Sequence, residues 1–297
     1  IGTRNTAIGI QSLYINTTGS NNIAIGVNAL SNNVKGSNKI AIGNNALSND
    51  TVSDNVAVGN NALSLNRGGL ANTAIGASAL GLNTSGFYNT AIGWSALIGN
   101  STGYENTAVG QHSLAANSTG NNNTAVGIQT LNSNTTGYEN TSMGSWALKA
   151  NVTGSGNSAF GHEVLVSNTT GTENSAFGKS SLRTNTTGAA NLAIGSFVLN
   201  SNLTGFYNTG LGARALYSNV GNSGTVAIGH NAMYYADNRT IGISTYNTAI
   251  GYEALKGSAT AANNTGTSNT TIGYQSLSSN TSGGGNLALG TTTMLAN

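Results

Sequence analysis

The three histidines of the chain are the first candidates for chemistry, because imidazole binds metals and transfers protons near neutral pH. His112, His162 and His230 each follow a recurring glycine by one or two residues, but the repeats that carry them are not neighbours. Stacking of the repeats therefore brings no two of them together, which argues against a metal site or a catalytic triad. We expect surface histidines, no metal and no cofactor.

The carboxylates give no catalytic pattern either. Glu105, Glu139 and Glu173 occupy the same position in every second repeat. If successive repeats stack about 4.8 Å apart, these like charges lie about 10 Å from one another, too far apart to form a carboxylate pair. The recurring glycines follow the repeat and do not form a phosphate loop. We therefore expect no enzyme.

The aromatic residues point to binding. They follow the glycine of a second recurring segment, Asn-Thr-Thr-Gly, and are Phe87, Tyr88, Tyr104, Tyr138, Phe206 and Tyr207. Because they share a position in the repeat, we expect them along one edge of the stack. Such an edge can stack on sugars or hold a protein partner, and it can equally pack between neighbouring chains of an oligomer.

Two longer repeats, within residues 230–273, provide a second candidate surface. Extra residues in a repeat must leave the regular wall, and such loops often carry recognition. They place Tyr234, Tyr235, Asp237 and Arg239 outside the wall in one repeat, and the segment that begins at Lys256 in the next. The alternative is that both insertions are tolerated without a ligand.

A single repeat positions all of these residues. The phrase Asn-Thr-Ala-Ile-Gly first ends at Gly9 and last returns at Gly290, and we call its glycine the motif glycine. Thirteen of the sixteen intervals between motif glycines are seventeen residues, one is sixteen and two are twenty-two. A fixed period of this size predicts an all-β solenoid of about seventeen coils over residues 1–297, as one repeat domain. Since the sequence begins and ends within a repeat, we expect it to be a segment of a longer protein.

Alternation within the phrase predicts a strand. The residue before the motif glycine is always large and apolar, and the residue two before it is small. Neighbours in a strand point to opposite faces. The residue three before, usually Thr, is replaced by Ile, Val or Leu in some repeats, as at Ile23 and Val56. We therefore expect the large apolar side chains to fill the interior, and the small ones to face a closely packed partner.

A leucine four residues after the motif glycine, as at Leu97, predicts a second strand that points into the same interior. The Asn-Thr-Thr-Gly segment predicts the return turn, because Gly and Asn tolerate positive φ. We expect the Asn side chains of the phrase to form a ladder from coil to coil. Many Asn-x-Ser/Thr triplets match glycosylation acceptors, but we interpret them first as turn residues.

Composition excludes several function classes. Only 6% of residues are charged and the formal net charge is +2, so the chain has no basic surface for nucleic acid. There is no apolar run long enough for a transmembrane helix, and we expect no membrane insertion in this segment. Cysteine is absent, and the absence of proline fits a chain whose backbone N–H groups are paired.

A coil of this size cannot be stable alone. Two buried apolar side chains contribute roughly 3–6 kcal/mol, whereas ordering one coil costs about 25 kcal/mol. Stacking must supply the difference. The narrow interior and the small-residue face favour burial against other chains, and three rolls around an axis would close such an assembly.

The repeated Asn-Ser/Thr-x-Ala-Ile/Val-Gly phrase, from Asn5 to Gly290, resembles the head repeats of YadA-like trimeric autotransporter adhesins and of trimeric tail fibres. The resemblance implies a left-handed parallel β-roll and a homotrimer. Adhesin heads usually have shorter coils, and no residue here indicates their known collagen binding.

These observations predict an extracellular, cell-surface fibre segment that is structural and binds a host-surface protein, a glycan or another fibre. The alternative is a tail-fibre segment of a phage or a contractile injection device, which flanking sequence would distinguish. A third possibility is ice binding, because regular Thr rows can match ice. Interruption of the Thr row by apolar residues suggests that it is buried and argues against this possibility.

Overall fold

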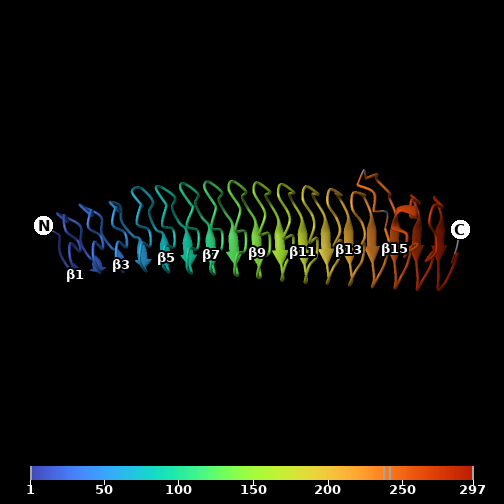
Figure 1. Cartoon of the computed structure of the whole chain (residues 1–297), viewed down its shortest axis with the longest axis horizontal. Coiled ribbons are helices and arrows are strands. Elements are labelled where there is room, and N and C mark those ends of the chain that lie inside the picture. The colour runs from blue at the N-terminus through green and yellow to red at the C-terminus, as the bar shows by residue number, and fades with distance from the viewer. Residues whose placement is uncertain (1, 237, 241, 296–297) are drawn as a thin grey trace. The chain divides into compact units, whose positions relative to one another are not determined.

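The structure is a computed structural model that describes residues 2–236, 238–240 and 242–295. The chain forms two compact units, Ile1–Trp146 and Ala147–Asn297. Each unit is a β-solenoid in which every coil contributes one short strand, and the strands of successive coils lie side by side (Figure 1). The predicted all-β repeat fold is therefore confirmed.

Within the described residues, the first unit contains nine strands of three residues each. They are β1 (Thr6–Ile8), β2 (Ile23–Ile25), β3 (Ile40–Ile42), β4 (Val56–Val58), β5 (Thr73–Ile75), β6 (Thr90–Ile92), β7 (Thr107–Val109), β8 (Thr124–Val126) and β9 (Thr141–Met143).

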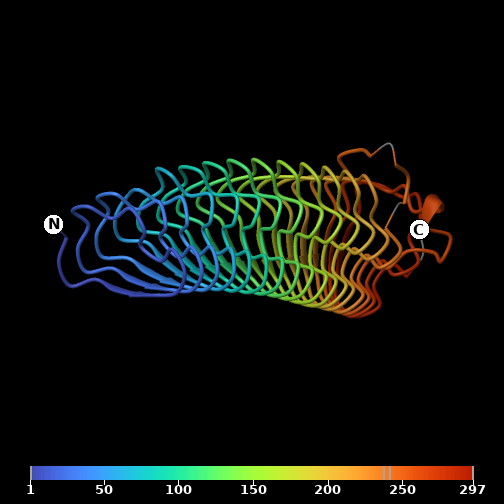
Figure 2. The same cartoon turned by 60° about the vertical axis from the view of Figure 1, so that its left-hand side comes forward.

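The second unit, over its described residues, contains eight strands and one short 3₁₀ helix. They are β10 (Ser158–Phe160), β11 (Ser175–Phe177), β12 (Leu192–Ile194), β13 (Thr209–Leu211), β14 (Val226–Ile228), β15 (Thr248–Ile250), η1 (Ala261–Asn263), β16 (Thr270–Ile272) and β17 (Leu287–Leu289). The helix lies in the second of the two longer coils. Figure 2 shows the chain of these coils departing from the regular wall.

The register of the parallel strands places equivalent residues of successive coils side by side. Thr90 of β6 is opposite Thr107 of β7, and Ala91 is opposite Ala108. The same one-to-one register holds at the sixteen-residue coil, where Ile40 of β3 is opposite Val56 of β4. Each position of the repeat therefore becomes a row of side chains that runs along its unit.

The interior is lined by the small residues, which reverses our prediction. Ala91 and Leu97 are fully buried, whereas Ile92 is 37% exposed. The coil is too narrow for two opposed rows of large side chains, so alanine faces the leucine row and isoleucine points outward. In one coil glycine replaces the interior alanine, and a neighbouring side chain fills the space that is left. At Gly210 an added Cβ would lie 2.4 Å from Cγ1 of Val198, which occupies the space of the missing methyl group.

The predicted second strand is also wrong, although its leucine does point inward. The residues after each motif glycine form turns, and Leu97 has a φ of 52° while Ser95 has a φ of 53°. Left-handed conformations cost L-residues about 1–2 kcal/mol each, and burying a leucine stabilises by about 1.5–3 kcal/mol. The turn still pairs with the next coil, because Leu97 N–H donates to the Ser113 carbonyl at 2.9 Å.

Two rows of asparagine side chains connect the coils, and the row predicted from the Asn-Thr-Ala-Ile-Gly phrase is confirmed. In it, Asn89 Nδ2 donates to Asn72 Oδ1 at 3.1 Å. The Asn-Thr-Thr-Gly residues form a second row, in which Asn100 Nδ2 donates to Asn83 Oδ1 at 2.7 Å and to the Gly103 carbonyl at 2.9 Å. Asn100 is fully buried, as are most asparagines of the glycosylation-like triplets, so their amides are structural.

Candidate functional site

The outer face of the strands carries a row of large apolar residues. The large residues that precede the motif glycines point outward here, and we call their rows the outer ladder. They are Ile8, Ile25, Ile42, Val58, Ile75, Ile92, Val109, Val126 and Met143 in the first unit, and Phe160, Phe177, Ile194, Leu211, Ile228, Ile250, Ile272 and Leu289 in the second. Many of them are exposed, among them Ile42, Ile75 and Phe177. An exposed apolar surface of this extent is typical of a face that binds a partner.

The aromatic residues lie along one edge of each unit, which we call the turn edge: the residues eleven and twelve positions after each motif glycine. In the first unit, Phe87 stacks on Tyr104 with ring centroids 5.0 Å apart and an angle of 4° between the planes. Tyr88 meets Phe87 edge-on at 5.4 Å and is itself exposed. Phe87 is therefore held in a ring stack, and Tyr88 presents its ring to solvent.

In the second unit, the turn edge is hollowed beside Phe206 and Tyr207. Three successive coils carry Thr172 and Glu173, then Ala189 and Ala190, then Phe206 and Tyr207 at the same two positions. Because the middle pair is small, a groove of about 320 Å³ opens between the larger neighbours, with Thr187 and Thr204 also lining it. We call it the turn-edge groove.

The turn-edge groove combines an aromatic wall with a carboxylate. Phe206 and Tyr207 meet edge-on at 5.4 Å, and Tyr207 is 69% exposed. Glu173 is exposed on the opposite wall. An apolar ring and a few polar groups that converge on one hollow suit a ligand with both apolar faces and hydroxyl groups.

The first insertion is tied down by its tyrosines. Tyr234 stacks on Tyr217 at 5.0 Å and meets Tyr235 edge-on at 4.6 Å. The Tyr235 carbonyl accepts a hydrogen bond from Asn264 Nδ2 of the second insertion. The two insertions thus contact each other, and both tyrosines serve packing. Arg239 is exposed, while Asp237 lies outside the described residues.

Lys256 forms an ion pair. Its Nζ lies 2.8 Å from Glu253 Oε1, and Gln275 Nε2 donates to Glu253 Oε2 at 2.9 Å. The hydrogen bond from Lys256 holds the pKa of the Glu253 carboxyl below its ordinary value. The hydrogen bond from Gln275 lowers this pKa as well, to a smaller extent. Beneath the insertions lies a cavity of about 20 Å³, lined in part by Tyr235 and Asn264, which has room for about one water molecule.

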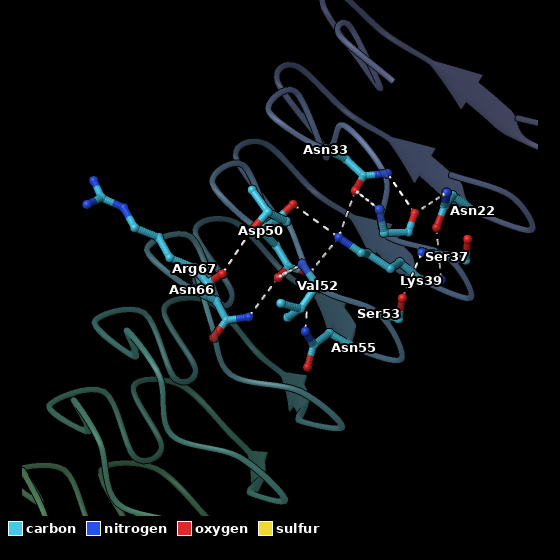
Figure 3. A network of polar contacts seen from close by, with 12 residues as sticks. Asn22, Asn33, Ser37, Lys39, Asp50, Val52, Ser53, Asn55, Asn66 and Arg67 are labelled. Atoms are coloured by element: carbon cyan, nitrogen blue, oxygen red, sulfur yellow. Dashed lines mark hydrogen bonds and ion pairs between the residues drawn. The ribbon is translucent and has the colours of Figure 1, made fainter. Parts of the chain in front are cut away.

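A buried ion pair that the sequence analysis missed lies in the third coil of the first unit. Lys39 Nζ is 2.9 Å from Asp50 Oδ2, and both side chains are fully buried (Figure 3). Lys39 stands where neighbouring coils carry the asparagine of the phrase, and Asp50 stands where they carry the asparagine of the turn. One coil has therefore exchanged both ladder asparagines for opposite charges.

The length of this coil explains the exchange. Its turn runs directly from Val52 to Ser53, without the glycine that neighbouring coils have there, which makes it the coil of sixteen residues. In the preceding coil, Asn22 Nδ2 donates to the carbonyl of the turn glycine Gly36 at 3.0 Å. The longer Lys39 side chain instead reaches the Asp50 carbonyl at 3.0 Å.

Further hydrogen bonds satisfy both charges. Lys39 Nζ also donates to Asn33 Oδ1 at 2.9 Å. Asp50 Oδ1 accepts from Asn66 Nδ2 at 2.8 Å, and Asp50 Oδ2 accepts from Asn55 Nδ2 at 3.2 Å. Burial lowers the pKa of the Lys39 amine and raises that of the Asp50 carboxyl, and the attraction between the two opposes both shifts. The site therefore brings an amine, an amide and a carboxyl group together in the absence of bulk water.

The histidines do not meet one another. His230 stacks on Tyr252 at 5.4 Å, Tyr252 stacks on Tyr274 at 5.3 Å, and His112 meets Trp94 edge-on at 4.5 Å. Over the described ranges, no group of three or more histidines and acidic residues could hold a metal ion. The same ranges contain no helix of the length and apolarity that crossing a membrane requires.

Comparison with protein-family models gives no match, and comparison with curated proteins gives none either. The function proposed below therefore depends on the surfaces described above.

Proposed function

We propose that this chain is a segment of an extracellular trimeric fibre with a structural and an adhesive role. The outer ladder carries the proposal, because it is a continuous apolar surface in each unit that only a large partner can cover. Identical copies are the simplest partner, since every copy presents the same rows at the same spacing. The narrow interior adds support, because alanine and leucine alone bury little apolar surface per coil.

Solution mass tests the trimer. We expect the chain to sediment as a trimer. Ile75→Glu combined with Ile92→Glu should give monomers, because each substitution places a charge on the outer ladder. Ser85→Glu combined with Thr102→Glu is the matched control, since both residues are exposed and lie off the outer ladder in adjacent coils. A wild-type monomer would contradict the trimer.

The turn-edge groove supports the adhesive role, with a surface glycan as the ligand that suits its aromatic wall and its carboxylate. Binding to a glycan array tests it. Tyr207→Ala should abolish binding, and Tyr88→Ala should leave it intact, because Tyr88 occupies the same repeat position without lining the groove. Equal loss in both variants would indicate that the aromatic edge as a whole binds the ligand.

The tail-fibre assignment fits the same surfaces and differs only in the flanking sequence. An anchor barrel would favour the adhesin, and a baseplate-binding or self-cleaving chaperone domain would favour the tail fibre.

One observation favours ice binding more than the sequence did. The Thr row lies on the outer face, and it is unbroken from Thr73 through Thr90, Thr107 and Thr124 to Thr141. The Thr row is therefore not interior, contrary to the prediction from its apolar replacements. A thermal-hysteresis assay decides the matter, and ice binding additionally requires that the outer face stay uncovered.

A further inference from the structure

The amine of Lys39 is placed to react with the side-chain amide of Asn33. We propose that these two residues form an intramolecular isopeptide bond, with Asp50 as the group that transfers the proton. The product would be a covalent link between the turn that contains Asn33 and Lys39, the residue that directly precedes β3. This inference is independent of the trimer and of any ligand.

The three groups meet at contact distance in a fully buried site. Lys39 Nζ is 2.9 Å from Asn33 Oδ1 and 2.9 Å from Asp50 Oδ2 (Figure 3). Asn33, Lys39 and Asp50 are all fully buried. Groups held in contact in this way gain much of the rate advantage of an intramolecular reaction, and burial keeps competing water away.

Gly36 leaves the space that the amine occupies. A Cβ at Gly36 would lie 2.4 Å from both Cε and Nζ of Lys39. The Gly36 N–H also donates to Asn33 Oδ1 at 3.0 Å. This donor points at the oxygen that becomes negatively charged when an amine adds to the amide carbon, so it stabilises that intermediate.

The site favours the proton transfer that the reaction needs first. An ammonium group cannot attack a carbon atom, so Lys39 must lose a proton. Burial lowers the pKa of its amine and raises the pKa of the Asp50 carboxyl, which accepts that proton directly. Both shifts favour the neutral pair that contains a free amine.

The reaction replaces the Cγ–Nδ2 bond of Asn33 with a bond from Cγ to Lys39 Nζ. The Lys39 Nζ lone pair forms a bond to Cγ of Asn33, and the C=O electrons move to Oδ1. As the carbonyl re-forms, the Cγ–Nδ2 bond breaks, and Nδ2 takes the proton held by Asp50 and the second proton released by Nζ. Ammonium leaves, a secondary amide remains, and Asp50 ends as the carboxylate with which it began.

Asn33 is a better acceptor than Asp50 for two reasons. Both Asp50 oxygens accept hydrogen bonds, Oδ2 from Lys39 and Asn55 and Oδ1 from Asn66 and the Val52 N–H, and these bonds hold the carboxyl group in place as the proton carrier. In addition, no second carboxylate of the described residues pairs with Lys39, so an amide to Asp50 would have no proton carrier. Other coils carry asparagine, or in one case Thr225, where Lys39 stands and therefore lack the amine.

Intact mass of the denatured full chain tests the proposal. We expect it to be lighter than the sequence mass by one ammonia. Trypsin does not cleave after an acylated lysine, so the peptide that ends at Lys35 should remain joined to a peptide that continues through Lys39. Tandem mass spectrometry should place the link between Asn33 and Lys39.

Matched variants distinguish the isopeptide bond from other reactions that lower the mass of the chain. Lys39→Arg keeps the charge and should restore the full mass, whereas Lys35→Arg, at an exposed lysine of the same turn, should retain the loss. Asp50→Asn should restore the full mass while keeping both bonding residues. Lys39→Asn combined with Asp50→Asn reproduces the residues of neighbouring coils, and should give a folded protein of full mass.

Three results would overturn the proposal. They are an unchanged wild-type mass, loss of one water with a link to Asp50, and loss of ammonia without a linked peptide. The last would indicate a succinimide at an asparagine.

Discussion

Ala91 and Ile92 are neighbours in β6, yet Ala91 is fully buried and Ile92 is 37% exposed. The alanine side points into a coil so narrow that a methyl group fills it. The isoleucine side covers the outer face. Two adjacent residues of one strand therefore differ in role. The buried alanine stabilises the chain itself, and the exposed isoleucine is available for a partner to cover.

The first prediction concerns the volume of the interior. Ala91→Leu should lower the free energy of unfolding by about 1–3 kcal/mol, because the added atoms have no space beside the leucine row. Thr90→Val is the matched control on the outer face and should change stability by less than about 0.5 kcal/mol. Urea unfolding of the two variants measures the difference, and equal effects would contradict the assignment of the faces.

The repeat period could be predicted from the sequence, because glycine at a fixed spacing indicates stacked coils whatever their detailed shape. Alternation could not predict which face is inside. It shows that Ala91 and Ile92 point to opposite faces, but not which of the two faces is buried. Volume decides it, since a coil with a single three-residue strand has no room for large residues on both walls. Counting a second strand at Leu97 made the expected coil too wide.

The Lys39–Asp50 pair had a signal that alignment of the repeats would have shown. Lys39 lies four residues before a motif glycine and Asp50 seven residues after it, both at asparagine positions, in the one coil of sixteen residues. The turn-edge groove had a weaker signal. It depends on Ala189 and Ala190 lying between larger neighbours, which is visible only once coils are known to stack in register.

The second prediction tests the asparagine rows. Asn100→Ala should destabilise the first unit by roughly 2–5 kcal/mol, because it leaves buried partners on Asn83, Asn117 and Gly103 without their hydrogen bonds. Thr102→Ala is the control, since it removes the glycosylation-like triplet at Asn100 and leaves the row intact. Thermal unfolding compares them. If both variants unfold like the wild type, the buried row contributes little to stability.

The third prediction separates steric contact from backbone strain. Gly273 has a φ of 143°, and a Cβ there would lie 2.3 Å from the carbonyl oxygen of Gly290 in the next coil. Gly285 has a φ of 70° with no atom within 4 Å of an added Cβ. Gly285→Ala should cost about 1–2 kcal/mol through its left-handed backbone alone. Gly273→Ala should cost more, because the coils must also move apart.

Hydrogen exchange in the last coils provides the measurement. Gly273→Ala should remove protection from amides on both sides of the contact, including the Gly290 N–H that donates to the Ile272 carbonyl at 2.8 Å. Equal protection in the two variants would show that strain, and not contact between coils, explains the regular spacing of glycines along the chain.

The fourth prediction is a pH dependence at Glu253. Its pKa is lowered from an ordinary value of 4.5, first by the hydrogen bond from Lys256 and then by the one from Gln275. A group whose folded pKa is lowered stabilises the fold above its unfolded pKa, and this contribution is lost as pH falls through the folded value. The second unit should therefore lose stability on acidification below about pH 4.5. Glu253→Gln should remove that part of the loss, because its amide does not titrate.

Glu173→Gln, at an exposed carboxylate of the same unit, is the control. Urea unfolding at a series of pH values measures both, and profiles that are identical for the Glu253 variant and the wild type would show that this carboxylate contributes nothing to the acid sensitivity of the unit.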